Sequence, residues 1–404
     1  MKKTNNKPAF EVADIFRMYG KEYEERNPML IEQRIVMDKT TNCRTAALGG
    51  HIYMCEDCGL KNNAYNSCGD RHCPKCQTLA KEQWLNNRKA ELLPMGYFHV
   101  VFTLPHMLNP VILTNKKVTL DILFNAVHQT LAAFAADPQW RLNGELGVIA
   151  VLHTWTQVLL DHFHLHCLIP AGALSCDRKS WTPARKKFLF RTSSLGKEFR
   201  KRYLEKLEDA YCAGELIFPG KTAELEMEEL FFGLTAKTRL QDWVVYAKRP
   251  FAGPEQVLEY LGRYTHRVAI SNNRIQSIDN GKIVFSYRDR QDENKKKTMP
   301  LVAHEFIRRF LLHVLPKRFT KIRYFGFLSH RNKKKNIALV RKLLDTVSEQ
   351  YETIKETARE IMLRLTGVDI HRCLKCNGQL IIDDELPRQP YYWERVDNLR
   401  LSPG

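Results

Sequence analysis

The feature that most limits how this chain can fold is a group of cysteines near its N-terminal end. Six of its eleven cysteines lie between residues 43 and 76, in a chain of 404 residues. The basic start of the chain lacks the apolar core of a secretory signal, so we expect a cytoplasmic protein with reduced thiols. Clustered reduced thiols favour metal binding over disulfide bonds. We therefore expect a small metal-binding module here.

Two CxxC pairs stand in this group, Cys55 with Cys58 and Cys73 with Cys76, separated by fourteen residues. Each pair can place two thiolates on one tight turn, and two such turns can form a tetrahedral four-sulfur site that suits Zn²⁺. We predict a structural zinc ribbon with these four ligands. Some neighbouring residues could form a second site, replace a ligand, or bind no metal: Cys43, His51, Cys68 and His72. Further along, Cys373 and Cys376 form half a zinc site with no partner pair nearby in the sequence.

The charge of the chain indicates a polyanionic partner. Lysine and arginine exceed aspartate and glutamate, for a formal net charge of +18. Such an excess favours nucleic acid, although a basic surface kept for solubility is the alternative. In two segments, cations alternate with aromatic side chains, as on surfaces that neutralise phosphates and stack bases. The candidates for DNA contact there are Lys186, Lys187, Arg191, Lys321 and Arg323. No apolar run approaches the ~18 residues needed to span a bilayer, so we expect no membrane partner.

The order of elements predicts an α+β protein. Residues 1–42 have the apolar spacing of amphipathic helices, and residues 303–365 have a helical, basic pattern. Apolar runs closed by proline or joined by an Asp-Asn-Gly turn predict antiparallel strands at 97–104, 147–155, 164–169, 274–278 and 282–287. We expect three segments: a helical and zinc-binding module, a central domain built on an antiparallel sheet, and a helical basic extension. Their predicted bounds are 1–80, 81–300 and 301–404.

One predicted strand carries alternating histidines, His162, His164 and His166. Alternate side chains of a strand share a face, so His164 and His166 project together. Two imidazoles placed in this way suit a divalent metal ion, which would polarise a phosphate or carbonyl oxygen. On the preceding strand, Gln157 or His153 could supply a third ligand. The alternative is a polar strand face that binds no metal.

Two tyrosines lie four residues apart, Tyr260 and Tyr264, in a segment that starts as a helix does, with proline and acidic residues. Their rings would lie one turn apart on the same face, as core tyrosines often do. The neighbouring cations Arg263, His266 and Arg267 favour another role, because they could hold a phosphodiester and ease formation of the phenolate. A tyrosine that attacks DNA forms a covalent phosphotyrosine, which stores the bond energy for a later rejoining step.

A cysteine group, a histidine pair on a strand and a paired-tyrosine helix, in this order, resemble the HUH endonuclease superfamily. More narrowly, the chain resembles the rolling-circle transposases of the insertion sequence ninety-one type, which are related to Helitrons. The departures are minor, because Phe163, where proline is commoner, and Asp70, where a basic or amide residue is usual, remove no ligand. The segments that carry the resemblance are 66–77, 98–106, 153–157, 162–170, 245–272 and 324–335.

This resemblance implies a central HUH endonuclease domain in which His164 and His166 hold Mg²⁺ or Mn²⁺ at the scissile phosphate. It also implies that Tyr260 or Tyr264 attacks, leaving a 5′-phosphotyrosine and a free 3′-OH, while the second tyrosine could cleave target DNA. The substrate would be single-stranded or locally melted DNA at the ends of a mobile element, and a homo-oligomer is one option. Two other functions stay open: a zinc-dependent nucleic-acid-binding protein without catalysis, and a related nicking replication initiator or relaxase.

Overall fold

The computed structural model describes residues 8–89, 91–185, 189–251, 256–257, 260, 262, 268–289, 292–345 and 356–388. Its central element is a five-stranded antiparallel sheet with the strand order β12-β4-β5-β3-β8. The strands are β3 (Tyr97–Thr103), β4 (Gly147–Trp155), β5 (Asp161–Pro170), β8 (Val245–Phe251) and β12 (Ile322–Gly326). The predicted α+β class with a central antiparallel sheet is confirmed.

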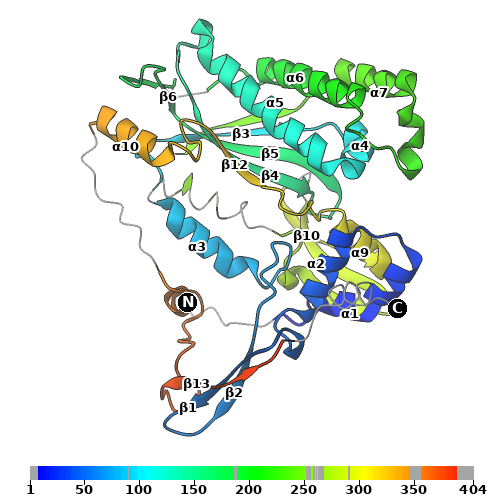
Figure 1. The fold of residues 1–404 in the computed structure, drawn as a ribbon, viewed down its shortest axis with the longest axis vertical. Helices are drawn as coiled ribbons and strands as arrows, with labels where there is room; N and C mark the ends of the chain where they lie inside the picture. Colours follow the sequence, from blue (N-terminus) through cyan, green and yellow to red (C-terminus); the bar gives the residue numbers. More distant parts are fainter. Residues whose placement is uncertain are drawn as a thin grey trace, which may run out of the picture.

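One face of this sheet is covered by helices (Figure 1). Phe98, Val100 and Phe102 of β3 alternate toward these helices, as do Leu165 and Cys167 of β5, and all five are buried in the largest core. Successive side chains of a strand point to opposite faces, so every second residue of these strands contributes to this core. The covering helices are α4 (Asn109–Thr114), α5 (Lys116–Ala136), α6 (Thr192–Cys212) and α7 (Glu228–Leu240).

Within the described residues, α5 is the single helix long and apolar enough to cross a membrane. More than half of its most apolar window is buried inside the protein, against the sheet. Core packing accounts for its apolar character.

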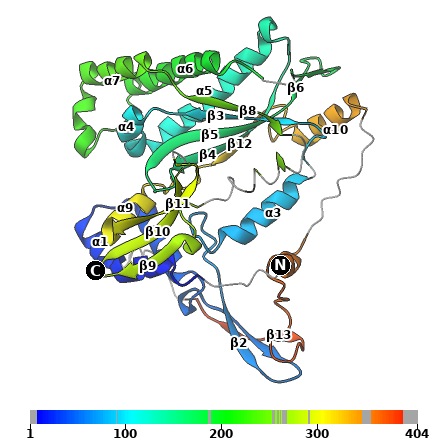
Figure 2. The ribbon, with the colours of Figure 1, turned by 180° about the vertical axis from the view of Figure 1, so that it is seen from behind.

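The other face of the sheet is only partly covered. Tyr97, Ile149 and Leu168 form a smaller core there with Val257 and Tyr324. Two helices lie on this side (Figure 2), α3 (Gln77–Lys89) and α10 (Lys333–Leu343). The rest of this face carries the histidines. We expected residues 303–365 to be helical throughout, and this is wrong at β12, which forms an edge strand because Ile322–Gly326 pairs with β4.

A second core joins the two N-terminal helices to a distant part of the chain. Phe16 and Phe310 meet edge to face, with ring centroids 5.4 Å apart. The predicted hairpin is confirmed, since Asn280 and Gly281 adopt positive φ angles of 47° and 73° between paired strands. The elements of this core are α1 (Val12–Arg26), α2 (Ile31–Asn42), β9 (Ile275–Asp279), β10 (Lys282–Asp289), β11 (Lys295–Val302) and α9 (Ala303–Leu311).

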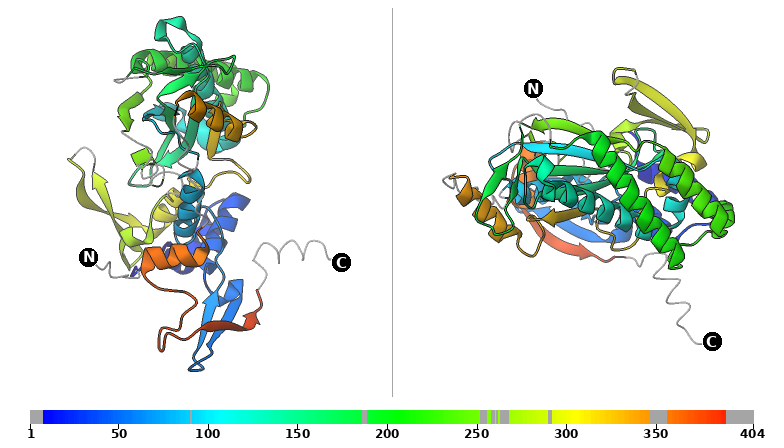
Figure 3. Two further views of the ribbon diagram at one scale, coloured as in Figure 1. Left: turned by 90° about the vertical axis from the view of Figure 1, so that its left-hand side faces the viewer. Right: turned by 90° about the horizontal axis from the view of Figure 1, so that it is seen from above.

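A third sheet joins a hairpin from the N-terminal part of the chain to a strand near the end of the described residues (Figure 3). Its order is β13-β1-β2, with β1 (Gly50–Cys55) between β2 (Lys61–Tyr65) and β13 (Leu380–Leu386). Helix α11 (Ala358–Thr366) precedes β13 and contacts α3. The remaining short elements are β6 (Gly172–Leu174), β7 (Trp181–Pro183) and five 3₁₀ turns at 46–48, 106–108, 138–140, 220–226 and 272–274.

Candidate active site and metal centres

Histidines from neighbouring strands gather on the sheet face opposite α5 and α6. His153 of β4 lies directly across from His164 of β5, and His166 follows on the same face of β5. Their ligand nitrogens all lie within 4.8 Å of one another, and all three side chains are buried. The prediction that His164 and His166 share a strand face is confirmed, because Leu165 and Cys167 point the other way, into the core under α5 and α6.

The hydrogen bonds of these rings fix which nitrogens can bind a metal. The Nδ1 atom of His164 lies 2.8 Å from the carbonyl oxygen of His162, so it carries the hydrogen and donates it. The lone pair of His164 is therefore on Nε2, which lies 3.1 Å from Nε2 of His166. The two facing nitrogens can share one hydrogen carried by His166, or both can bind one cation. The donor set fits a divalent metal ion, and the carbonyl oxygen of His162 holds the His164 ring in the orientation that points Nε2 at that ion.

The sequence left Gln157 and His153 open as the third ligand. The ring of His153 lies beside both members of the pair, with centroids 5.4 Å from His164 and 4.7 Å from His166. Gln157 lines the same cleft, and its backbone oxygen accepts a hydrogen bond from Arg274. His153 is thus the residue that completes a three-imidazole group, and a ligand role for Gln157 stays a prediction.

Tyr260 reaches this group from a segment that is helical at residues 256–257, 260 and 262. Its Oη atom lies 2.5 Å from Nε2 of His99 and 2.9 Å from Nδ1 of His166. The phenol and the imidazoles, distant in sequence, therefore lie side by side. The other predicted residues of this helix, Tyr264, Arg263 and Arg267, lie outside the described residues.

His99 was not singled out from the sequence. It lies on β3 with its side chain on the histidine face, next to His166, whose Nδ1 is 2.9 Å from His99 Nε2. Burial lowers the pKa of His99 to about 4, together with the positive charge of Lys248, which lies opposite His99 on the neighbouring strand β8. A neutral imidazole can accept the phenol hydrogen of Tyr260. The sequence did contain a signal for His99. It lies in the predicted strand 97–104, and alternation along that strand places its side chain on the face opposite Phe98 and Val100.

A cleft of about 860 Å³ opens in front of the histidines. The sheet forms one wall with Trp155, Tyr246 and Lys248, and the β10–β11 hairpin contributes Tyr287 and Arg288. Aromatic rings and cations beside a histidine group are the surface chemistry that binds single-stranded nucleic acid.

The described basic residues predicted to contact DNA do not line this cleft. Arg323 lies on the helix-covered face, where its guanidinium pairs with Asp121 and stacks 4.1 Å from the Phe124 centroid. Burial and the charge of Arg71 lower the pKa of Lys321 to about 8. Arg191 is exposed just before α6 on the helix-covered side. Lys186 and Lys187 lie outside the described residues.

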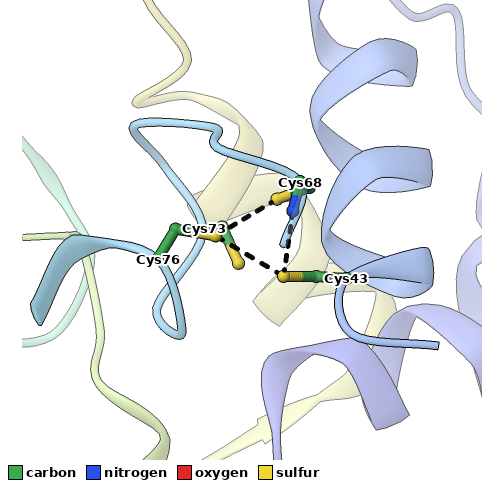
Figure 4. Close-up of side chains that lie close together, drawn as sticks. All are labelled: Cys43, Cys68, Cys73 and Cys76. Carbon is green, nitrogen blue, oxygen red and sulfur yellow. Dashed lines mark hydrogen bonds between the residues drawn. The ribbon is translucent and has the colours of Figure 1, made fainter. Parts of the chain in front are cut away.

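The cysteines form two four-sulfur groups, which corrects the single zinc site predicted from Cys55, Cys58, Cys73 and Cys76. The turn of Cys55 and Cys58 lies at the tip of the β1–β2 hairpin, whereas residues 68–76 return to the end of α2. The hairpin therefore separates the two CxxC pairs. Figure 4 shows the first group, Cys43, Cys68, Cys73 and Cys76. The second group is Cys55, Cys58, Cys373 and Cys376.

In the first group, Sγ of Cys76 lies 3.5 Å from that of Cys43 and 3.6 Å from that of Cys68. Hydrogen bonds from Cys68 and Cys73 lower the pKa of Cys43 to about 7, which favours the thiolate that a metal requires. The neighbouring His72 is occupied, because Asp70 lies 2.9 Å from its Nδ1 and the Leu315 N–H donates to its Nε2. His51 belongs to neither sulfur group.

Comparisons with known proteins agree with this arrangement. Residues 15–104 match the family described as "Transposase zinc-binding domain", and residues 147–336 match the family described as "Putative transposase". The zinc-binding match covers the first cysteine group, and the second match covers the histidine strands and the tyrosine segment. The protein is therefore a transposase, a DNA-binding and DNA-cleaving enzyme with a zinc-binding domain.

Two relatives extend the match over most of the chain. It is 46% identical to "Putative transposase y4qJ" of Sinorhizobium fredii, over 95% of this chain and 98% of the relative. It is 28% identical to "Transposase for insertion sequence element IS801" of Pseudomonas savastanoi pv. phaseolicola, over 85% of this chain and 81% of the relative. The chain belongs to the insertion sequence ninety-one type family of transposases. No solved structure matches it.

Proposed function

We propose that this transposase is an HUH-type single-strand endonuclease and strand transferase, which nicks and rejoins element ends during rolling-circle transposition. The observation that carries the proposal is the position of Tyr260, whose Oη lies 2.9 Å from His166, a member of the three-imidazole group. A nucleophile beside a metal-binding group in an open cleft is the arrangement that phosphodiester cleavage by a tyrosine requires.

His153, His164 and His166 would hold Mg²⁺ or Mn²⁺, which supplies Lewis-acid polarisation of a phosphate oxygen. Tyr260 donates its phenol hydrogen to Nε2 of His99, the closest acceptor, 2.5 Å away. The phenol oxygen then forms the bond to phosphorus, and the bond from phosphorus to the 3′ oxygen breaks. That oxygen takes a proton from solvent water and leaves as a 3′-OH, and the 5′ end stays on the tyrosine. His99 returns the phenol proton to solvent, so the step balances.

The proposal has further parts that rest on the resemblance of the chain. Tyr264 supplies a second nucleophile, for target DNA or for a second cut while Tyr260 is occupied. Single-stranded DNA occupies the cleft, where Lys248 and Arg288 neutralise phosphates and Tyr246 and Tyr287 stack bases. The chain works in the cytoplasm, where the thiols stay reduced, and a homo-oligomer remains one option. The segments 1–80, 81–300 and 301–404 stay a predicted division of the sequence, in which β12 of the last segment completes the sheet of the second.

A covalent-adduct assay tests the proposal. The protein is incubated with single-stranded DNA from element ends and Mn²⁺, and the products are separated on a denaturing gel. We expect an adduct that requires Mn²⁺ and is lost in Tyr260→Phe combined with Tyr264→Phe. The single variants identify the nucleophile of the first cut.

The matched control is Tyr53→Phe, since Tyr53 lies on β1, away from the cleft, and its variant should form the adduct at the wild-type rate. An adduct that survives in the double variant would refute the tyrosine chemistry. Tight DNA binding with no adduct from the wild type would favour a binding protein without catalysis.

A further inference from the structure

The second cysteine group is built from two turns with the same backbone geometry. In the first turn, the Gly59 N–H donates to the Cys55 oxygen at 2.9 Å, and the Cys55 N–H donates to the Leu60 oxygen at 3.0 Å. In the second turn, the Asn377 N–H donates to the Cys373 oxygen at 2.9 Å, and the Cys373 N–H donates to the Gly378 oxygen at 2.8 Å.

The residue after the second cysteine has a positive φ in both turns, 67° at Gly59 and 62° at Asn377. Glycine and asparagine are the residues that adopt this conformation most readily. Each turn therefore presents a pair of thiols on a tight loop, although the two sequences share only the CxxC spacing. This repeated geometry is what a four-sulfur metal site needs from each of its halves.

The two turns face each other across a short gap. Sγ of Cys55 lies 3.4 Å from Sγ of Cys376, and Sγ of Cys58 lies 3.7 Å from Sγ of Cys373. Four sulfurs bound tetrahedrally at ~2.3 Å from zinc are about 3.8 Å apart, whereas sulfurs joined in a disulfide are ~2.05 Å apart. The observed separations match a shared metal ion, not two disulfides.

Two more contacts fit this reading. The backbone N–H groups of Lys375 and Gly378 each donate to a cysteine sulfur of the second turn, at 3.4 Å, as donors to a thiolate would. Gly378 also permits the close approach of the turns, because a Cβ there would lie 2.9 Å from Sγ of Cys55.

We propose that Cys55, Cys58, Cys373 and Cys376 bind a second Zn²⁺ ion, which clasps the C-terminal part of the chain onto the N-terminal hairpin. The first cysteine group is complete without these residues. The two halves of the proposed site are separated by 315 residues, and the zinc-binding family match ends at residue 104. The ligands of this clasp are therefore distinct from the residues of the cleavage chemistry proposed above.

The clasp holds elements that have few other attachments. β13 pairs with β1 from Leu380 to Leu386, yet most of its side chains are exposed or half-buried. α11 contacts α3 through the Arg364–Glu82 ion pair at 3.3 Å and buries mainly Ile361. Exposed ion pairs contribute little to stability, so the metal would add an attachment to the backbone pairing of β13 with β1.

From α3 the contact continues to the tyrosine segment. A Cβ at Gly262 would lie 2.8 Å from Cδ1 of Leu85 and 3.0 Å from Cε of Lys81, both on α3. Leu85 and Tyr260 also pack against the same core, which contains Val257. The clasp thus supports, through α11 and α3, the helix surface behind Tyr260.

Zinc content of the purified full chain tests the clasp. We expect two zinc ions per chain by elemental analysis, with an X-ray absorption spectrum of sulfur ligands at about 2.3 Å. Cys373→Ser combined with Cys376→Ser should leave one zinc ion. Cys55→Ser combined with Cys58→Ser should also leave one, although these residues lie at the other end of the chain. The matched control, Cys176→Ser with Cys212→Ser, removes two exposed cysteines outside both groups and should leave two.

Limited proteolysis gives a second measurement that does not depend on activity. In the Cys373 and Cys376 double variant, trypsin should release the C-terminal segment much faster than from wild type, while residues 8–345 stay protected. One zinc ion in the wild type, or two in the double variant, would overturn the clasp. The two double variants should behave alike, because the two cysteine pairs bind the same ion. If only one of them lost both zinc ions and unfolded globally, the clasp would be overturned as well.

Discussion

At the scale of single residues, the hydrogen bond from His164 to the carbonyl oxygen of His162 decides how the site can work. It places the lone pair of His164 on Nε2, facing His166, before any ligand binds. A neutral imidazole carries one hydrogen, so when Nε2 of His166 binds a metal its hydrogen is on Nδ1. His166 can then donate this hydrogen to the Tyr260 oxygen. His99 then remains as the acceptor for the Tyr260 hydrogen.

His99→Gln should therefore slow adduct formation by about 10²-fold, the usual contribution of a positioned proton acceptor. DNA affinity should stay near the wild-type value, since phosphate contacts by distributed cations dominate binding. Single-turnover cleavage rates and fluorescence anisotropy measure the two effects. His128→Gln serves as the control, because His128 stacks on Phe325 away from the cleft. A cleavage rate within twofold of wild type would assign His99 a packing role only.

At the scale of elements, the tyrosine segment depends on its contact with α3. Gly262 permits this contact, since any side chain there meets Leu85. A branched side chain would push the segment away from α3, and small displacements of a nucleophile reduce rates strongly.

We expect Gly262→Val to slow adduct formation by roughly tenfold or more while the zinc content stays unchanged. The matched control is Gly233→Val in α7, where a Cβ meets no atom within 4 Å. Cleavage kinetics compare the two variants. Equal rates for both glycine variants would show that the α3 contact does not position the nucleophile.

The elements themselves divide into those that local sequence determines and those that it does not. The strand 97–104 and the turn at Asn280 and Gly281 followed from alternation and from positive-φ residues, and both are confirmed. β12 escaped prediction because its cations and aromatics suggested a DNA surface, whereas pairing with β4 made it a sheet edge. His99 escaped because its role depends on Tyr260, which is 161 residues away.

The cysteine pairing failed for the same reason. Spacing identified the CxxC turns correctly as paired thiols, but spacing cannot select which turn meets which. The pair Cys373 and Cys376 has no partner pair close in sequence, and β1–β13 pairing is what brings Cys373 to Cys58.

At the scale of the whole molecule, one lysine connects the two large cores. Lys116 begins α5 in the sheet core, and its Nζ donates to the carbonyl oxygens of Leu312 and Val314 at 2.9 Å each. Burial lowers the pKa of Lys116 to about 8. The pKa of Lys116 is lower in the folded state than in the unfolded state, so between pH 8 and pH 10.5 the unfolded state binds more protons. The contribution of Lys116 to the free energy of unfolding therefore rises as pH increases from about 8 toward 10.5.

Lys116→Ala should lower the free energy of unfolding by about 1–3 kcal/mol, because two buried carbonyl groups lose their donor. Lys117→Ala is the control, since Lys117 is exposed and pairs only loosely with Asp121 at 3.6 Å. Urea unfolding of both variants at pH 7 and pH 9 measures the difference. Identical midpoints for the two lysine variants would show that the cores are joined without Lys116.

The pairing of β1 with β13 also has a consequence for biosynthesis. A ribosome makes β1 long before residues 380–386, so the hairpin emerges with one strand edge open and with its two thiols, Cys55 and Cys58, lacking their counterparts. Every chain must keep that edge from aggregating until translation is almost complete. A chain truncated before Cys373 would keep the histidine strands but would lack β13 and half of the second cysteine group.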